Sequence, residues 1–266
     1  MAFILTDLSQ QNLATSIQTN MHDFFRQFAL QQPQPRSDSQ RWQTDIQHPW
    51  FNGVLVDRLP EPGDENLIQE LQEFFRSKGI QNWTWWVDLP ALPQDWAGML
   101  GKAGFRFEHD TPGMAMQLAD LPGDLDEVPG LTIHKVTSLP ELKTWSRVFV
   151  EGYGLPLGWA DPYFEMMAGL GLDQSALSYL GELDGEPVAV SSLYLGAGVA
   201  GIYNVATLPK ARRKGIGAAL TVVPLLEARE MGYQAAILQS SQAGYGVYKK
   251  LGFEHLCEVE VFVWDG

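Results

Sequence analysis

The stretch Arg212-Arg-Lys-Gly-Ile-Gly217, followed by the apolar run Ala218-Ala-Leu-Thr-Val-Val223, decides the fold of the second half of this chain. The two glycines let another group approach the backbone closely, because they carry no side chain. The apolar run reads as the start of a buried helix, whose first amides have no helical acceptor and carry partial positive charge. This order predicts a seat for a phosphate group at the start of a helix.

Two other phosphate-binding motifs are excluded by spacing. A P-loop needs a Gly-Lys pair followed by a serine or threonine, and the chain contains no such triplet. A dinucleotide fingerprint needs a third glycine three positions after Gly217, where the chain has Leu220. The loop therefore belongs to neither class of nucleotide-binding protein.

Strands and helices alternate on both sides of the loop, which predicts a mixed α/β sheet covered by helices. In the second half we expect strands at 131–136, 178–183, 187–194, 200–206, 234–239, 253–256 and 258–264, with helices at 139–151, 161–170, from the loop to 231, and 245–251. In the first half we expect helices at 8–30, 66–78 and 95–103, with strands at 51–59, 83–87, 105–108 and 113–118. The polar segment 31–47 is expected to cross the surface.

The chain is long enough for two domains, and its halves share a skeleton. Leu59-Pro60 matches Leu208-Pro209 at an offset of 149, and Gly104-Phe105 matches Gly252-Phe253 at an offset of 148. Near-identical offsets at two separate points indicate an internal repeat. The segment Asp120–Gly130 is rich in proline, glycine and acid, so we predict a linker there, between domains at 1–122 and 131–266.

Composition excludes several classes of protein. A formal net charge of −14 does not suit a general nucleic-acid binder, and no apolar stretch is long enough to cross a membrane. No basic residue precedes Arg26, so the start does not resemble a secretory signal peptide and we expect a cytoplasmic protein. A single cysteine, Cys257, and no pair of histidines at ligand spacing lead us to expect no metal.

The second half resembles the GNAT superfamily of acetyl-CoA-dependent N-acyltransferases. Arg212-x-x-Gly215-x-Gly217 fulfils the family signature Arg/Gln-x-x-Gly-x-Gly/Ala. The strand Gly201–Pro209 before it looks like the family's fourth strand, and Tyr248-Lys-Lys-Leu-Gly-Phe253 after it looks like the family's Tyr-x-x-x-Gly-Phe helix end. Three motifs in the expected order cover residues 131–264, so the resemblance implies two tandem GNAT-like domains, the first of them degenerate.

The resemblance also implies roles for individual residues. Backbone groups of Val205 and Thr207 would bind the thioester and the pantetheine arm, and Tyr248 would be the general acid for the leaving thiolate. The positions expected to hold the cofactor, acetyl-CoA, are Val205, Thr207, Arg212, Arg213, Lys214, Gly215, Ile216, Gly217, Ala218, Ser241 and Gly244. Two alternatives stay open: Tyr248 as a packing residue of an apolar helix face, and Ser241 as a helix N-cap.

The acceptor and the general base do not follow from the motifs. The acceptor would be a small-molecule amine or a protein amino group, and the sequence leaves a homodimer open. Candidates for the base are Glu151, Tyr153, Asp161 and an ordered water. An acceptor pocket with aromatic walls is one interpretation of the residues Trp145, Tyr153, Trp159, Tyr163 and Phe164.

The first half lacks the chemistry of the second. The positions equivalent to Gly215 and Gly217 are Asn66 and Ile68, and the acidic loop Glu61–Glu65 precedes them. Such a loop would repel a diphosphate, so we expect no cofactor site in residues 1–122. A silent acyl-CoA sensor and an interaction protein remain the alternatives to an enzyme.

Overall fold

The computed structural model describes residues 3–30, 39–56, 65–87, 96–122, 127–172 and 176–265. The chain divides into two compact units, each made of two segments. The large unit comprises Met1–Phe24 and Pro112–Cys257, and the small unit comprises Phe25–Thr111 and Glu258–Gly266. The chain therefore passes between the units three times.

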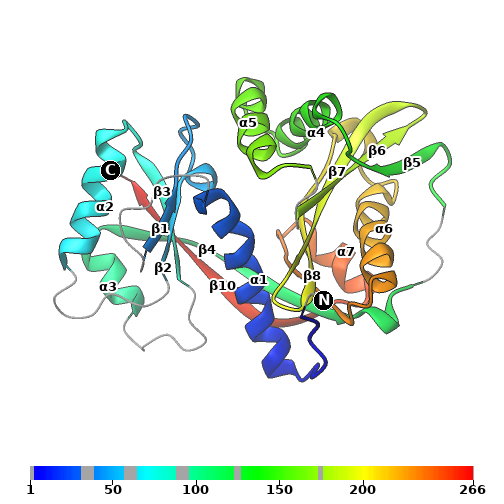
Figure 1. The fold of residues 1–266 in the computed structure, drawn as a ribbon, viewed down its shortest axis with the longest axis horizontal. Coiled ribbons are helices and arrows are strands. Elements are labelled where there is room, and N and C mark those ends of the chain that lie inside the picture. Colours follow the sequence, from blue (N-terminus) through cyan, green and yellow to red (C-terminus); the bar gives the residue numbers. More distant parts are fainter. Residues whose placement is uncertain are drawn as a thin grey trace. The chain divides into compact units, whose positions relative to one another are not determined.

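The large unit is built on a mixed sheet with the strand order β4-β9-β8-β7-β6-β5 (Figure 1). Neighbouring strands are antiparallel except for β8 and β9, which run parallel. The strands are β4 (Phe105–Gln117), β5 (Leu131–Lys135), β6 (Ala176–Leu183), β7 (Glu186–Gly196), β8 (Val199–Thr207) and β9 (Ala235–Gln239).

Helices cover both faces of this sheet (Figure 1). The first part of α1 (Gln10–Leu30), α4 (Leu139–Gly152) and α5 (Ala160–Leu170) lie on one face, and α6 (Ile216–Glu230) and α7 (Tyr245–Leu251) lie on the other. Side chains alternate along β7 accordingly: the Ser191 hydroxyl bonds to α6, whereas the Tyr194 ring contacts Phe24 of α1. Single turns of 3-10 helix lie at Leu118–Asp120, Leu157–Trp159 and Pro209–Ala211.

The small unit has the strand order β1-β2-β3-β10. Its elements are β1 (Ser39–Trp42), a 3-10 turn at Pro49–Phe51, β2 (Gly53–Val56), α2 (Glu65–Ser77), β3 (Asn82–Val87), α3 (Trp96–Lys102) and the end of β10 (Glu254–Asp265). Trp83 and Trp85 are fully buried on one face of β3, where Phe75 stacks on Trp83 with ring centroids 4.6 Å apart. Aromatic packing of this kind stabilises the core of a small sheet.

The two halves of the sequence repeat one order of elements and exchange their last strands. The order β2-α2-β3-α3-β4 in the first half corresponds to β8-α6-β9-α7-β10 in the second. The end of β4, Gly113–Gln117, pairs with β9 of the large unit, and the end of β10, Phe262–Asp265, pairs with β3 of the small unit. Each unit therefore completes its sheet with a strand supplied by the other half of the sequence.

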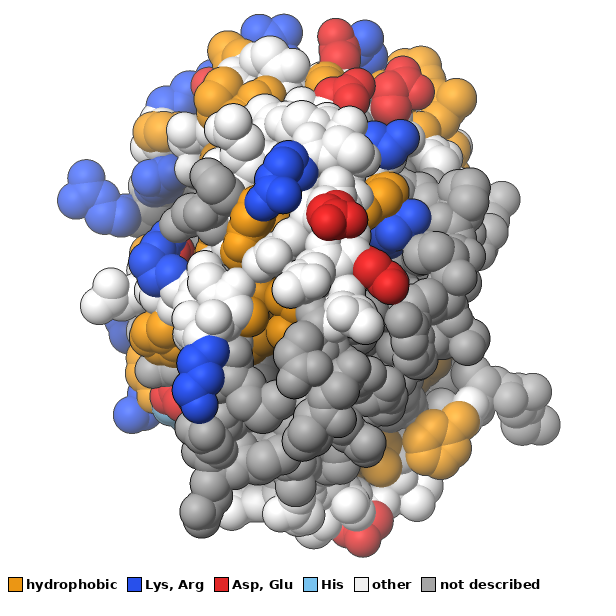
Figure 2. Space-filling view, turned by 90° about the vertical axis from the view of Figure 1, so that its left-hand side faces the viewer, with side chains coloured by type: hydrophobic (Ala, Val, Ile, Leu, Met, Phe, Trp, Pro, Cys, Tyr) orange, Lys and Arg blue, Asp and Glu red, His pale blue; other side chains and the backbone are white. Residues whose placement is uncertain are grey.

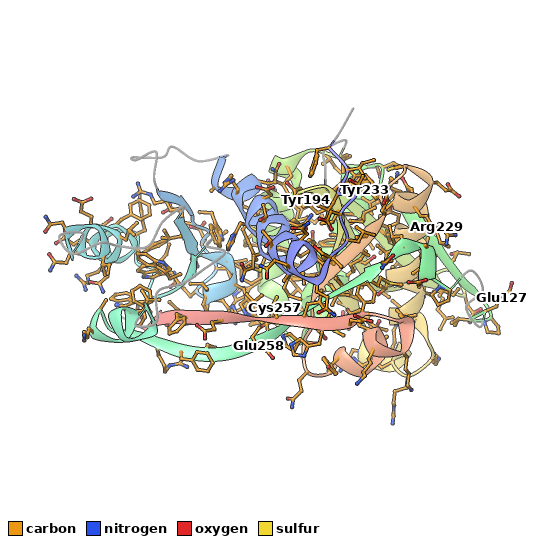
Figure 3. The ribbon with its side chains drawn as sticks, turned by 90° about the horizontal axis from the view of Figure 1, so that it is seen from below. Glu127, Tyr194, Arg229, Tyr233, Cys257 and Glu258 are labelled. Carbon is orange, nitrogen blue, oxygen red and sulfur yellow. The ribbon has the colours of Figure 1, made fainter. Side chains whose placement is uncertain are left out.

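This exchange corrects the predicted boundaries. We predicted domains at 1–122 and 131–266, whereas the units meet between Phe24 and Phe25, between Thr111 and Pro112, and between Cys257 and Glu258. Cys257 and Glu258 lie next to each other on β10 (Figure 3). Part of the predicted linker, residues 123–126, lies outside the described residues.

The predicted elements are confirmed with two differences. We predicted four short strands at 105–108, 113–118, 253–256 and 258–264, but the structure has two long ones, β4 and β10. Pro112 does not end β4, because its carbonyl accepts a hydrogen bond from the Ser240 amide at 2.9 Å. The other difference is in the segment 31–47, which we expected to cross the surface: it contains β1, and its Trp42 and Ile46 are buried. Residues 31–38 of that segment and residues 57–59 of the predicted strand 51–59 lie outside the described residues.

No helix in the described ranges is long and apolar enough to cross a membrane.

Candidate functional site

Strands β8 and β9 separate after a short parallel pairing in the large unit. Ala200, Gly201 and Ile202 pair with β9, and no later residue of β8 has a partner there. The backbone from Tyr203 to Thr207 is thus open on the side facing β9. In sheets with parallel strands, ligands bind beyond the carboxyl ends of strands, where the chain diverges.

The opposite edge of the same segment carries a bulge. Ser192 pairs with Tyr203 and Val190 pairs with Ala206, so Ser191 faces two residues of β8, Asn204 and Val205. Asn204 has a left-handed backbone with φ of 56°, and its side-chain amide donates to the Ser192 hydroxyl at 3.2 Å. Bulges redirect backbone groups at sites of function. Val205 therefore lies where β8 is paired with neither neighbour.

The first part of α1 holds the preceding residue of β8. The Tyr203 hydroxyl donates to Asn20 Oδ1 at 2.6 Å, and the Tyr203 ring stacks on Phe24 at 4.2 Å. The Asn20 side-chain amide donates to the Gly196 carbonyl at 2.8 Å. The sequence gives no sign of this contact, because Asn20 and Phe24 lie far along the chain from the loop Arg212–Gly217.

The basic loop after β8 is fixed by Arg212. Its Nε donates to the Thr207 carbonyl at 3.0 Å, and its Nη2 donates to the Gly152 carbonyl at 2.7 Å. The guanidinium thus joins the end of β8 to the end of α4. We predicted Arg212 and Thr207 as cofactor contacts. In the structure these two residues bond to each other, because the Arg212 guanidinium donates to the Thr207 carbonyl.

Helix α6 begins directly after this loop without a side-chain cap. Gly215, at the N-cap, has a left-handed backbone with φ of 83°, a conformation that glycine adopts without strain. The first helical bond is donated by the Ala219 amide to the Gly215 carbonyl at 3.1 Å. The amides of Ile216, Gly217 and Ala218 precede it, so they are free to donate to an anion.

The side of the helix at Gly217 is uncrowded among the described residues. A side chain at Gly217 would meet only the Thr207 hydroxyl, at 3.9 Å from its Cβ. Arg213 and Lys214 are exposed, and neither forms an ion pair with another described residue. Lys210 differs, because it pairs with Glu186. The geometry can hold a doubly charged phosphate group on backbone amides, with two cations at the rim.

Tyr248 lies on α7 and is only 9% exposed. Burial raises the pKa of its phenol well above the ordinary value, the Tyr153 phenol adds to the rise, and the Thr221 hydroxyl opposes it. The phenol therefore keeps its proton at neutral pH and can only donate it. The packing interpretation of Tyr248 also has support, since its ring lies in the core and contacts Phe253 edge-on at 5.9 Å.

The turn before α7 differs from its predicted use. We expected Gly244 to leave room for the cofactor, but a Cβ there would lie 2.8 Å from the Tyr248 ring, so the ring occupies that space. The Ser241 hydroxyl accepts a hydrogen bond from the Gly244 amide at 3.2 Å. This bond lies in the turn before α7, whose N-cap is Gly244, so Ser241 is not the N-cap that we kept as an alternative. Contact of Ser241 with a cofactor stays a prediction.

The aromatic residues of α4 and α5 form a core rather than a wall. Trp145 and Tyr163 are buried and stack on each other with ring centroids 6.0 Å apart, and Phe149 stacks on both. Tyr153 differs: it follows the last residue of α4, is 39% exposed, and has a pKa raised to about 12 by the protein around it. Of the five aromatic residues in the interpreted pocket, Trp145 and Tyr163 are thus inaccessible to an acceptor.

The candidates for a general base are reduced by the same geometry. The Tyr153 phenol is protonated at neutral pH, because an ordinary tyrosine has a pKa of about 10 and the protein packed around its ring raises the pKa of Tyr153 further, to about 12, although part of the side chain is exposed. Asp161 forms an ion pair with Lys143 at 2.9 Å. Glu151 is exposed at the end of α4, next to Gly152, whose carbonyl binds Arg212. Glu151, Asp161 and an ordered water remain the candidates, because an ion pair between two exposed side chains leaves the Asp161 carboxylate accessible.

Comparison with known proteins agrees with this geometry. Residues 142–253 match the model of the Acetyltransferase (GNAT) family. A GCN5-related N-acetyltransferase from Kribbella flavida has a similar structure, with a TM-score of 0.69 and 18% identity over 94% of this chain and 96% of its own. No curated protein sequence matches the chain.

Two further solved structures extend the likeness. A GCN5-related N-acetyltransferase from Sphaerobacter thermophilus has a TM-score of 0.62 and 17% identity over 85% of this chain and 75% of its own. A tandem GNAT protein from the clavulanic acid biosynthesis pathway has a TM-score of 0.56 and 14% identity over 98% of this chain and 96% of its own. At these identities the likeness shows the fold, a mixed α/β arrangement with two related halves.

Proposed function

We propose that the chain is an N-acetyltransferase that transfers an acetyl group from acetyl-CoA to a primary amine, on the premise that residues 142–253, which match the model of the Acetyltransferase (GNAT) family, are a working member of it. The observation that carries the proposal is the uncapped start of α6 beside the open backbone of β8. The free amides at the start of α6 suit a diphosphate. The unpaired backbone of β8 suits an extended pantetheine arm that ends in a thioester.

The residues would divide the binding between them. The amides of Ile216, Gly217 and Ala218 would donate to the diphosphate, and Arg213 and Lys214 would add charge at the rim. Arg212 would act indirectly, by holding the loop to β8 and α4. When bound, the cofactor supplies an activated acetyl group as a thioester.

The transfer itself would use Val205 and Tyr248. As the amine nitrogen attacks the thioester carbon, the Val205 amide would donate to the carbonyl oxygen, on which negative charge develops. The carbon–sulfur bond then breaks, and Tyr248 would give its proton to the departing sulfur. The proton lost by the amine would pass to Glu151, to Asp161 or to water, so the step yields an amide and a free thiol.

We propose a small-molecule amine or a protein amino group as the acceptor, a cytoplasmic location, and neither nucleic acid nor membrane as a partner. On the face in Figure 2, basic side chains are interspersed with acidic and hydrophobic ones, whereas a nucleic-acid surface needs a continuous basic field. The net charge of −14 points the same way. We also propose a homodimer, and a measurement of the mass of the protein in solution would test it.

A second candidate function is an acyl-CoA sensor that does not turn over. The observation in its favour is the packing of Tyr248 in the core, which limits how the phenol reaches a sulfur atom. Substitution of Tyr248 by phenylalanine separates the two functions, because it removes only the hydroxyl.

The test is a screen of amines that follows thiol release from acetyl-CoA, with parent and Tyr248→Phe proteins side by side. For an enzyme we expect release with at least one amine and a fall in kcat of at least about a hundredfold in the variant, the lower end of the range for a lost general acid. Saturable acetyl-CoA binding without release for any amine would favour the sensor. Absence of binding would exclude both.

A further inference from the structure

Helix α6 contains a proline, and the carbonyl that it leaves without a partner is bonded elsewhere. Pro224 has no amide hydrogen, so the Leu220 carbonyl one turn earlier cannot accept a helical hydrogen bond from it. The Ser191 hydroxyl donates to this carbonyl at 2.7 Å. Strand β7 is thus bonded to the interior of α6 at a point created by the proline.

Ser191 is also the residue at which the pairing of β7 and β8 shifts. It faces Asn204 and Val205 across the bulge. Its carbonyl accepts a hydrogen bond from Trp145 Nε1 of α4 at 3.1 Å, and the residue is fully buried. Ser191 is therefore held from both faces of the sheet at the same position.

The bonds of Ser191 connect the two ends of the proposed cofactor site. Leu220 lies one helical turn after Ile216, where the diphosphate would bind, and Val205 lies opposite Ser191, where the thioester would bind. A single molecule must reach both, so their relative placement matters to the reaction. A bond from β7 to α6 holds the bulge at a fixed position along the helix.

We propose that Ser191 is a positioning residue for the Val205 amide, and that Pro224 exists in α6 to free the carbonyl that anchors it. This inference rests on the proposed function and deepens it, since it names residues of the site that lie outside the sequence motifs. Neither residue needs to touch acetyl-CoA.

The first part of the test measures the binding of coenzyme A, which has no acetyl group, and the turnover of acetyl-CoA, which has one. In Ser191→Ala we expect the Kd for coenzyme A to stay within about twofold of the parent, because the α6 amides are unchanged. We expect kcat for thiol release to fall about ten- to hundredfold with little change in KM, because the misplaced amide acts mainly as the carbonyl gains charge. Calorimetry and the thiol assay measure the two quantities.

A second variant separates positioning from core stability. Ser191→Ala leaves the Leu220 carbonyl unpaired, and adding Pro224→Ala returns the amide that the helix lacks. In the double variant we expect Tm to recover toward the parent while kcat stays low. If kcat recovers together with Tm, the serine only satisfies a buried carbonyl, and the proposal is wrong.

The matched control is Ser146→Ala, since Ser146 is also fully buried in the large unit and its hydroxyl bonds to no described group. We expect parental kcat there, and a loss equal to that of Ser191→Ala would contradict a specific role. The two proposals fail differently. A parent that does not bind coenzyme A contradicts the transferase function, whereas a parent that binds and reacts, with a double variant equally active, contradicts only the role of Ser191.

Discussion

The two halves repeat one order of elements, yet among the described residues only the large unit separates its central strands. In the large unit β8 and β9 pair at Ala200–Ile202 and then separate. In the small unit β2 and β3 pair from Gly53 to Val56, which an offset of 149 places on Ile202 to Val205. The small unit therefore keeps its strands joined over the positions at which the large unit frees its backbone.

The loop before the next helix also differs between the units: it is basic before α6 and acidic before α2. In the large unit Arg213, Lys214 and Gly215 precede α6, whereas α2 begins at Glu65 after an acidic loop that lies outside the described residues. Both differences support the proposal that the small unit holds no cofactor. A shared order of elements thus does not by itself make a binding site; the separation of two strands and the charge of one loop do.

Deleting the first half of the chain should have the largest effect on stability, because it removes elements that complete the large unit. A chain shortened to residues 131–266 lacks Ile17 and Phe24 of α1 and Met114 of β4, all buried in the full chain. Each contributes about 1.5 to 3 kcal/mol, and the whole stability of a domain is about 5 to 15 kcal/mol. Circular dichroism should show no cooperative unfolding. A folded short chain that binds acetyl-CoA would contradict the exchange of strands.

Arg212 has no counterpart with the same bonds in the small unit, because its equivalent, Gly63, has no side chain to donate them. In Arg212→Lys we expect a loss of about 1 kcal/mol in unfolding free energy, since lysine keeps the charge but cannot donate to both carbonyls. Arg213→Lys is the control for stability and should leave the unfolding free energy unchanged, because Arg213 is exposed and forms no ion pair with another described residue. If Arg212→Lys matches the parent in unfolding free energy and in acetyl-CoA affinity, the charge of Arg212 matters and its two hydrogen bonds to the Thr207 and Gly152 carbonyls do not.

Glu227 gives the smallest expected effect and a dependence on pH. It accepts hydrogen bonds from Lys135 and from the Tyr179 hydroxyl at 2.7 Å, and so joins α6 to β5 and β6. Burial acts to raise the pKa of Glu227, but the Lys135 and Tyr179 bonds and the Lys135 charge outweigh it, so the pKa is lowered. Such a carboxylate stabilises the fold above its unfolded pKa, and this contribution is lost as pH falls through the folded pKa.

We therefore expect Glu227→Gln to lower the unfolding free energy at pH 7 by about 1 kcal/mol, a loss that shrinks as pH falls through the lowered pKa of Glu227. Urea denaturation at several pH values measures it. The equivalent position in the small unit is Lys78, which is exposed, so Lys78→Gln should change nothing. A deficit in Glu227→Gln that is constant from pH 7 to pH 3 would contradict the ion-pair explanation.

How much was predictable depends on whether a feature is local. The strands, the helices and the loop Arg212–Gly217 follow from periodicity and glycine placement, and the structure confirms them. The unit boundaries do not, because the pairing of β4 with β9 and of β10 with β3 is decided by residues far apart in sequence. The proline- and glycine-rich segment 120–130 does not mark the division between the units, which lies elsewhere along the chain.

The site shows the same limit. Arg212 was identifiable as part of a motif, but its bonds to Thr207 and Gly152 depend on where α4 ends in space. Ser191 gave no signal of its own in an apolar strand. Pro224 did give one, since a proline inside a helix leaves one carbonyl in need of a donor, but the sequence does not say which residue provides it.

The central claim is that the start of α6 seats the diphosphate of coenzyme A. Calorimetric titration of Gly217→Asp with acetyl-CoA tests it directly, because aspartate in the first turn favours the helix but repels a bound anion. We predict one site per parent chain, an affinity at least about a hundredfold weaker in Gly217→Asp at parental Tm, and no change in the control Gly101→Asp, whose glycine lies in open space on α3. Equal affinity in Gly217→Asp and the parent would contradict the claim.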